Sequence, residues 1–276
     1  LKRQAFEDVP CSEVYGNRAT AHELLELKKV FQETGESKDP EEDASVAFRI
    51  NLEEKKAVAL TACKEGDEEQ LARLLAAASE AACTAELLDA RTDEEIKVDD
   101  FYIVKGSTPL IVAVTVGHQA CAGLLLQSAS DPEHVAALLA AKDAYDRTPL
   151  HFAASSGSEA CAGLLLQSAS DPEHVAALLA AKDNYDSTPL HFAASKGREA
   201  CAHLLLQSAS DPEHTAALLA AQNDIGGDTP LHVAAYNGWE ACVKVFLEAG
   251  AKRSLKNKRG ETALDIAAEE GHEAVL

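Results

Sequence analysis

The chain has 276 residues and a formal net charge of −21, because 46 acidic side chains outnumber 25 basic ones. Nucleic acids and anionic membranes are bound through basic patches, so this charge argues against either as the main partner and favours a basic or neutral protein. No run of 18 apolar residues occurs, and we therefore expect no segment inserted in a membrane.

Residues 1–50 predict an N-terminal extension with one amphipathic helix over about 21–34, followed by a polar loop over 35–45. Leu24, Leu25 and Phe31 lie on the apolar face of this helix. Two roles stay open for it: covering the first helices of the rest of the chain, or docking on a partner. No signal peptide is recognisable at Leu1, but the chain begins without Met, so a missing leader or upstream segment stays open.

Residues 54–107 predict three helices and a hairpin. The helices are expected over 54–64, 68–77 and 81–88, and two short strands, at 96–98 and 101–104, across Asp99-Asp100. The hairpin carries aromatic residues that either contact a partner or pack over the next part of the chain.

An internal repeat follows. Residues 120–143 recur without change at 160–183, and a third copy at 200–223 differs at His203, Thr215, Gln222 and Asn223. Each copy is preceded by a turn in which Thr caps a helix and Pro takes its first position. These turns are Thr108-Pro109-Leu110, Thr148-Pro149-Leu150, Thr188-Pro189-Leu190 and Thr229-Pro230-Leu231, and a weaker version is Thr262-Ala263-Leu264.

Within one unit, the turn predicts a short helix over 150–156 that ends at Gly157 in a left-handed conformation. A second helix is expected over 159–167, with Cys161, Leu164 and Leu165 on its buried face. Asp131-Pro132-Glu133 then combines a cap, a first-position proline and an acid near the helix dipole. We therefore predict third helices over 132–140, 172–180 and 212–220, stacked as a layer beside the second helices.

The Thr-Pro-Leu turn occurs in register in four units, with His as the next residue in three of them, and a Leu-rich helix follows. This pattern is similar to the ankyrin repeat. The resemblance implies an all-α ankyrin-repeat solenoid with projecting β-hairpin fingers over 51–276, to which the third helices are an addition. Its units would cover about 54–107, 108–147, 148–187, 188–228 and 229–261, with a partial unit over 262–276. Because that partial unit stops inside its second helix, we expect the native protein to continue, or the chain to be a fragment.

The chain has seven cysteines, of which Cys121, Cys161, Cys201 and Cys242 recur once per unit. Equivalent points on stacked helices lie roughly 8–10 Å apart, whereas a disulfide needs Cα atoms within about 7 Å. We interpret these cysteines as small buried residues, which indicates the cytoplasm or another reducing intracellular compartment.

We find no phosphate-binding glycine loop, paired-cysteine zinc motif or nucleophile elbow, and we predict neither catalysis nor a metal or other cofactor. His134, His174 and His214 form the only row that suggests a metal. Ligands of one metal must lie about 3–4 Å apart, closer than stacked units allow, so we interpret the row as polar residues at exposed helix starts. The resemblance implies that His151, His191 and His232 form hydrogen bonds between units.

The resemblance also implies a concave groove that binds another protein through finger tips and first helices. Carried over to this chain, the finger positions are Ala144, Tyr145, Arg147, Asn184, Tyr185, Ser187, Asp224, Ile225, Asp228, Lys258, Arg259 and Glu261. The helix positions are Thr115, Val116, Ser155, Ser156, Ser195, Lys196, Tyr236, Asn237, Glu269 and Glu270. Tyr145, Tyr185 and Tyr236 are the expected anchors, because tyrosine is enriched at interfaces.

Two further features of the sequence bear on these expected contact residues. Asp146 and Asp186 replace the finger glycine, whose left-handed backbone Asp tolerates at some cost. The basic residues at 252, 253, 256, 258 and 259 are either a solvated edge or a docking spot for an acidic partner.

The leading hypothesis is therefore a non-catalytic protein-interaction scaffold. The alternative is a structural subunit of a larger assembly or filament. A third possibility is a regulatory array attached to an enzyme outside these residues.

Overall fold

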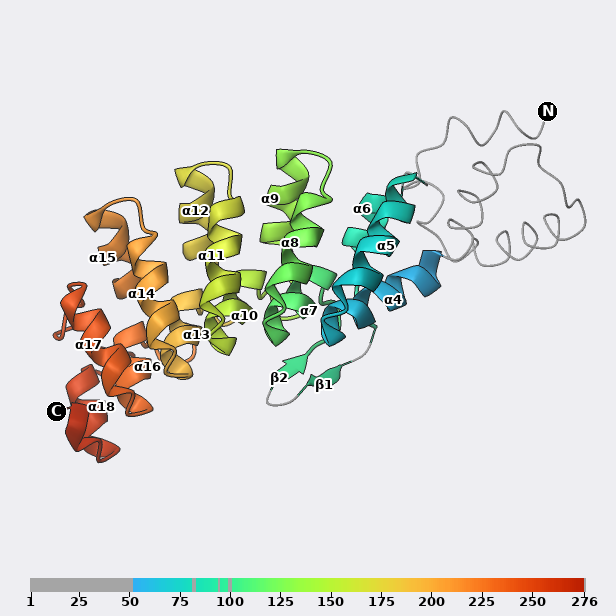
Figure 1. The fold of residues 1–276 in the computed structure, drawn as a ribbon. Helices are drawn as coiled ribbons and strands as arrows, with labels where there is room; N and C mark the ends of the chain where they lie inside the picture. Colours follow the sequence, from blue (N-terminus) through green and yellow to red (C-terminus); the bar gives the residue numbers. More distant parts are fainter. Residues whose placement is uncertain (1–51, 81–82, 94, 99–100, 276) are drawn as a thin grey trace, which may run out of the picture.

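The computed structural model describes residues 52–80, 83–93, 95–98 and 101–275. The helix predicted over 21–34 and the loop over 35–45 lie outside the described residues. The remainder is a row of short helices that follow one another along a curved array (Figure 1). Apart from one two-stranded hairpin, the described elements are all helical, and none of these helices is long and apolar enough to cross a membrane.

The helices form three rows. Equivalent helices of successive units contact each other throughout the first two rows, and those of the third row follow one another along the array (Figure 1). The first row contains α4 (Leu52–Glu65), α7 (Pro109–Val116), α10 (Pro149–Ser156), α13 (Pro189–Ser195), α16 (Pro230–Tyr236) and α18 (Ala263–Glu269). The second contains α5 (Glu68–Glu80), α8 (Gln119–Gln127), α11 (Glu159–Ser168), α14 (Glu199–Gln207) and α17 (Glu240–Glu248). The third contains α6 (Thr84–Leu88), α9 (Pro132–Ala140), α12 (Pro172–Leu179) and α15 (Pro212–Ala220).

The first helices begin and end at the predicted signals. Thr108 Oγ1 accepts from the amide of Ile111 at 3.2 Å, and a proline follows each cap from Thr108 to Thr229. Gly117 and Gly157 end α7 and α10 with φ of 90° and 81°. Glycine adopts this left-handed conformation at no steric cost, so both stop signals are confirmed.

The third helices are present at the predicted positions. Each is capped by an Asp side chain, as where Asp131 Oδ1 accepts from the amide of His134 at 2.8 Å. Their last turns bury pairs of leucines, namely Leu138 and Leu139, Leu178 and Leu179, and Leu218 and Leu219. They do not pack only beside the second helices as expected: α9 also contacts α10, and α15 contacts α16, each in the following unit.

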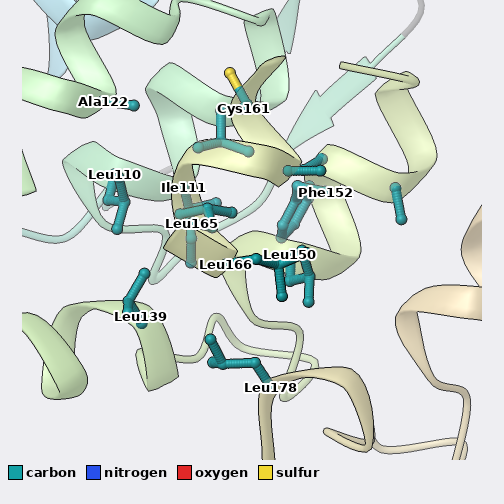
Figure 2. Packing of buried hydrophobic residues seen from close by; sticks show 14 of the residues in the cluster. Leu110, Ile111, Ala122, Leu139, Leu150, Phe152, Cys161, Leu165, Leu166 and Leu178 are labelled. Carbon is teal, nitrogen blue, oxygen red and sulfur yellow. The ribbon is translucent and has the colours of Figure 1, made fainter. Parts of the chain in front are cut away.

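The core is one continuous cluster that runs across the unit boundaries. Figure 2 shows Leu110 and Ile111 of α7 near Leu150 and Phe152 of α10, with Leu165 of α11 packed among them. The four repeat cysteines are all buried, as predicted. Since each unit buries its apolar face against its neighbours, the array is stabilised by contacts between units.

The first finger is the predicted hairpin. β1 (Ile96–Val98) pairs antiparallel with β2 (Phe101–Ile103), with Ile96 opposite Ile103. Asp99, Asp100 and the side chains of residues 96–102 lie outside the described residues, so the expected contact role of its aromatics stays a prediction. At its base, Thr92 Oγ1 donates to the carbonyl of Val104 at 2.7 Å. The hairpin projects on the side of the first helices, opposite the third row (Figure 1).

The last unit consists of α18 and a short 3₁₀ turn, η1 (Glu273–Val275). The second helix expected there is therefore not an α-helix over the described residues. His272 Nε2 donates to the carbonyl of Tyr236 at 2.9 Å and ties this turn to the preceding unit.

Candidate protein-binding surface

Each later finger is organised by one polar side chain at its start, which is buried in three fingers and partly buried at Asn223. These residues are Asp143, Asp183, Asn223 and Asn257. Asp183 Oδ1 accepts from the amides of Tyr185 and Ser187 at 2.9 and 2.8 Å. Asn257 Oδ1 does the same for Arg259 and Glu261, both at 3.0 Å. Aspartate and asparagine thus hold the same turn.

Backbone hydrogen bonds join one finger to the next. The amide of Asn184 donates to the carbonyl of Tyr145 at 3.1 Å, and that of Asp224 donates to the carbonyl of Tyr185 at 2.7 Å. The amide of each tyrosine therefore donates to a side chain of its own finger, and its carbonyl accepts from the backbone of the next finger. This fixes the backbone from which their rings project.

Asp146 and Asp186 have φ of 60° and 57°, whereas Gly227 and Gly260 hold similar conformations in later fingers. The predicted left-handed backbone at the two aspartates is confirmed. Lys142 and Lys182 lie 3.8 and 3.3 Å from these carboxylates, but all four side chains are about half exposed and contribute little to stability.

Three apolar side chains on successive finger tips face solvent. Tyr145 is 43%, Tyr185 48% and Ile225 72% exposed. They line a hollow of about 410 Å³ whose other walls include Phe192 and Val233 from the first helices. Large apolar side chains exposed around a concavity are typical of an interaction site.

Arg147 lies on one wall of this hollow and is engaged within the chain. Its Nε donates to Asp143 Oδ2 at 2.8 Å, and its guanidinium lies 5.1 Å from the ring centre of Tyr145 and 4.6 Å from that of Phe152. Such stacking combined with an ion pair stabilises a guanidinium strongly. Arg147 therefore shapes the hollow, and its charge is already compensated.

Two of the carried-over residues are buried. Thr115 is only 1% exposed, and its hydroxyl donates to the carbonyl of Ile111 at 2.7 Å, because α7 turns this position into the core. Thr115 is therefore not available as a side-chain contact. Ser187 is 9% exposed and its carbonyl accepts from His151, but it still borders the hollow.

The other carried-over positions are at least partly exposed. They are Val116, Ala144, Ser155, Ser156, Asn184, Ser195, Lys196, Asp224, Asp228, Tyr236, Asn237, Lys258, Arg259, Glu261, Glu269 and Glu270. Of these, Ser195 lines the hollow, and its hydroxyl donates to the carbonyl of Phe192 at 3.0 Å. The other residues are exposed enough to contact a partner, but exposure alone does not assign them a role in binding.

In the basic cluster at the fifth finger, two of the five side chains form ion pairs within the chain. Lys258 Nζ lies 2.7 Å from Asp224 Oδ1, and Arg259 Nε lies 2.8 Å from Glu261 Oε2. Lys252, Arg253 and Lys256 are exposed and form no ion pair with any described residue. Because two of its five charges are compensated within the chain, the cluster is a weaker docking spot for an acid than its sequence suggests.

The Thr-Pro-Leu histidines bridge the units, as the resemblance implied. His151 Nδ1 accepts from the amide of Thr148 at 3.1 Å, so Nε2 carries the proton that it donates to the carbonyl of Ser187 at 3.0 Å. His191 and His232 make equivalent bonds to Asp228 and Glu261. Burial lowers the pKa of His151 and of His191 to about 4, so both are neutral near pH 7.

The histidines of the third helices are partly or fully exposed, and the amides of all three donate to the capping aspartates. His174 Nδ1 also lies 2.7 Å from Asp171 Oδ2. Among the residues that the structure describes, no three histidine, cysteine or acidic side chains are grouped so as to hold a metal ion.

Sequence reasoning missed several features of this face. Phe192 and Val233 follow the caps Thr188 and Thr229 by four residues, a spacing visible in the sequence, but neither is among the residues carried over from the family. A second hollow of about 520 Å³ lies between α4 and the first finger, lined by Leu60, Ile103 and others. Except for Val112, its residues come from the first unit, which lacks the Thr-Pro-Leu signal.

The comparison with protein families agrees with the geometry. A family model described as ankyrin repeats, in three copies, matches residues 60–176, 131–216 and 213–276. The chain therefore belongs to the ankyrin repeat family. No curated protein sequence matches it. Ankyrin repeats are generally protein–protein interaction modules, and the family is typically non-enzymatic.

Proposed function

We propose that the chain is a non-catalytic scaffold that binds a protein partner on its concave face. The observation that carries the proposal is the hollow beneath the finger tips, where Tyr145 and Tyr185, whose backbones are fixed by hydrogen bonds, expose apolar surface together with Ile225. A binding site formed before the partner arrives loses less conformational entropy on binding. The net charge of −21 favours partners with a basic surface.

The proposed location is the cytoplasm or another reducing compartment. Cys121, Cys161, Cys201 and Cys242 are buried thiols, and burial raises the pKa of Cys201 and Cys242 to about 11. Such thiols pack as small apolar groups and react slowly. These properties support the location without assigning it.

Partner capture from native extract, followed by mass spectrometry, tests the function. The wild-type chain is compared with a Tyr145→Ala/Tyr185→Ala double variant and with Gln167→Ala, an exposed position on α11 outside the hollow. Proteins captured by wild type and Gln167→Ala but lost by the double variant support the proposal. Capture that survives loss of both tyrosines contradicts it.

A further inference from the structure

We propose that the hollow binds an arginine side chain of the protein partner, held between the rings of Tyr185 and Phe192 and the carboxylate of Asp183. The inference deepens the proposed function and rests on it. Its basis is a comparison between two fingers of this chain that have the same framework and differ at one position.

In the finger that begins at Asp143, the chain supplies its own guanidinium. Arg147 covers the ring of Phe152, lies over Tyr145 and forms an ion pair with Asp143 at 2.8 Å. Tyrosine, phenylalanine and aspartate recur in the next finger as Tyr185, Phe192 and Asp183, but Ser187 replaces the arginine.

The consequences are visible in the finger that begins at Asp183. Asp183 is 7% exposed, as is Asp143, yet its carboxylate accepts only two backbone amides and forms no ion pair with any described residue. Phe152 is buried beneath its guanidinium, whereas Phe192 is partly exposed and lines the hollow together with Tyr185 and Asp183. A nearly buried carboxylate without a cation is costly and is stabilised by a charge-assisted hydrogen bond.

The charges around the hollow favour a cation. Arg147 contributes a positive charge on one wall, but Asp143 compensates it. His191 is neutral near pH 7, because burial lowers its pKa to about 4. The carboxylate of Asp183 is therefore the uncompensated charge among the residues that line the hollow.

The geometry favours arginine over lysine. A planar guanidinium lies flat on an aromatic ring while it donates two parallel hydrogen bonds to a carboxylate, whereas an ammonium group has no such plane. In the preceding finger, the guanidinium of Arg147 lies 4.6 Å from the ring centre of Phe152, and its Nε donates one hydrogen bond to Asp143 Oδ2. The excess of acidic residues over the whole chain would attract a basic segment to this face.

The test uses acetyl-Gly-Arg-Gly-amide as the probe and the same peptide with citrulline, which is neutral and nearly isosteric, as its control. Binding is followed by NMR through the backbone amides of Tyr185, Ser187 and Phe192. We expect saturable shifts with a Kd of about 1–10 mM for the arginine peptide, and at least tenfold weaker binding of the citrulline peptide.

Two pairs of variants locate the site. Asp183→Asn removes the charge but keeps the turn, since Asn223 and Asn257 hold the equivalent turns. It should weaken binding of the arginine peptide at least fivefold, whereas Glu173→Gln, at an exposed position on α12 outside the hollow, should not. In Ser187→Arg, the new guanidinium should occupy the site and weaken binding of the arginine peptide at least tenfold. Ser187→Ala should bind the peptide as the wild type does.

Equal binding of the arginine and citrulline peptides, or full binding by Ser187→Arg, overturns the inference. Partner capture separates this failure from that of the proposed function. If capture is lost with Tyr145→Ala/Tyr185→Ala but persists with Asp183→Asn and Ser187→Arg, the concave face binds the partner without the arginine site. If the arginine peptide binds as expected but the Tyr145→Ala/Tyr185→Ala variant still captures the partner, the proposed function is wrong and the arginine site is retained.

Discussion

At the scale of single residues, the histidine of each Thr-Pro-Leu-His turn joins two units through one ring. His151 accepts from the cap of its own helix and donates to the carbonyl of Ser187 in the next unit. Only the neutral ring can do both, because a protonated ring has no acceptor. Protonation therefore breaks a cap as well as adding a buried charge.

This arrangement predicts a loss of stability in mild acid. The pKa of His151 and His191 is about 4 in the folded chain and about 6.5 when unfolded. Between these values the unfolded chain binds more protons. Stability is thus complete above about pH 6.5 and falls as the pH decreases toward 4, by up to about 3 kcal/mol for each histidine.

Urea unfolding at pH 7.0 and 4.5 measures this effect. The midpoint should fall clearly at pH 4.5 for wild type. A His151→Asn/His191→Asn variant should be less stable at pH 7.0 but lose less between the two pH values. Equal midpoints of the wild type at both pH values would show that these histidines do not control the acid response.

At the scale of elements, the residue before several second helices forms a hydrogen bond with the preceding unit, although Ser158 before α11 instead caps its own helix. Trp239 Nε1 donates to the carbonyl of Ser195 at 3.2 Å, and Arg198 Nε donates to that of Ser155 at 3.1 Å. His118 and His272 bind the carbonyls of Lys64 and Tyr236 in the same way. These bonds satisfy carbonyls at the ends of the first helices, which lack a partner within the helix.

Trp239 provides the clearest test of this contact. Trp239→Ala removes the hydrogen bond and the ring packed over Gly197, and should cost about 1–2 kcal/mol because the ring is only partly buried. Trp239→His should retain more stability, since His118 and His272 form the equivalent bond. Thermal unfolding compares the three proteins, and equal losses in the two variants would argue against the hydrogen bond.

The third helices also belong to the core rather than to an appended layer. Leu139 is buried at the end of α9, whereas Val135 one turn earlier is only partly buried. Leu139→Ala should therefore cost about 2–4 kcal/mol and Val135→Ala about 1 kcal/mol or less. Chemical denaturation measures both, and similar small costs would mean that the third helix does not support the array.

At the scale of the whole molecule, the repeated residues were enough to predict the array. Thr-Pro starts, glycine stops and Asp-Pro-Glu starts are local signals, so they marked the helices without knowledge of their packing. The hairpin between residues 96 and 103 followed from apolar alternation in the same way.

Features of the concave face depended on contacts between units and were less predictable. Thr115 seemed suitable for binding until the rotation of α7 placed it in the core. Arg147 was expected to face a partner, but it pairs with Asp143 and stacks on Phe152. Phe192 is not among the expected contact residues, because only the comparison of neighbouring fingers shows that Ser187 leaves it partly exposed.

The affinity of a captured partner for two forms of the chain tests the central claim most directly. Wild type and Tyr145→Ala/Tyr185→Ala are compared by calorimetry after thermal unfolding has shown that both are equally folded. If the concave face is the binding site, loss of both rings should cost about 2 kcal/mol or more, a roughly 30-fold increase in Kd. An unchanged Kd would place the partner elsewhere on the molecule and contradict the account.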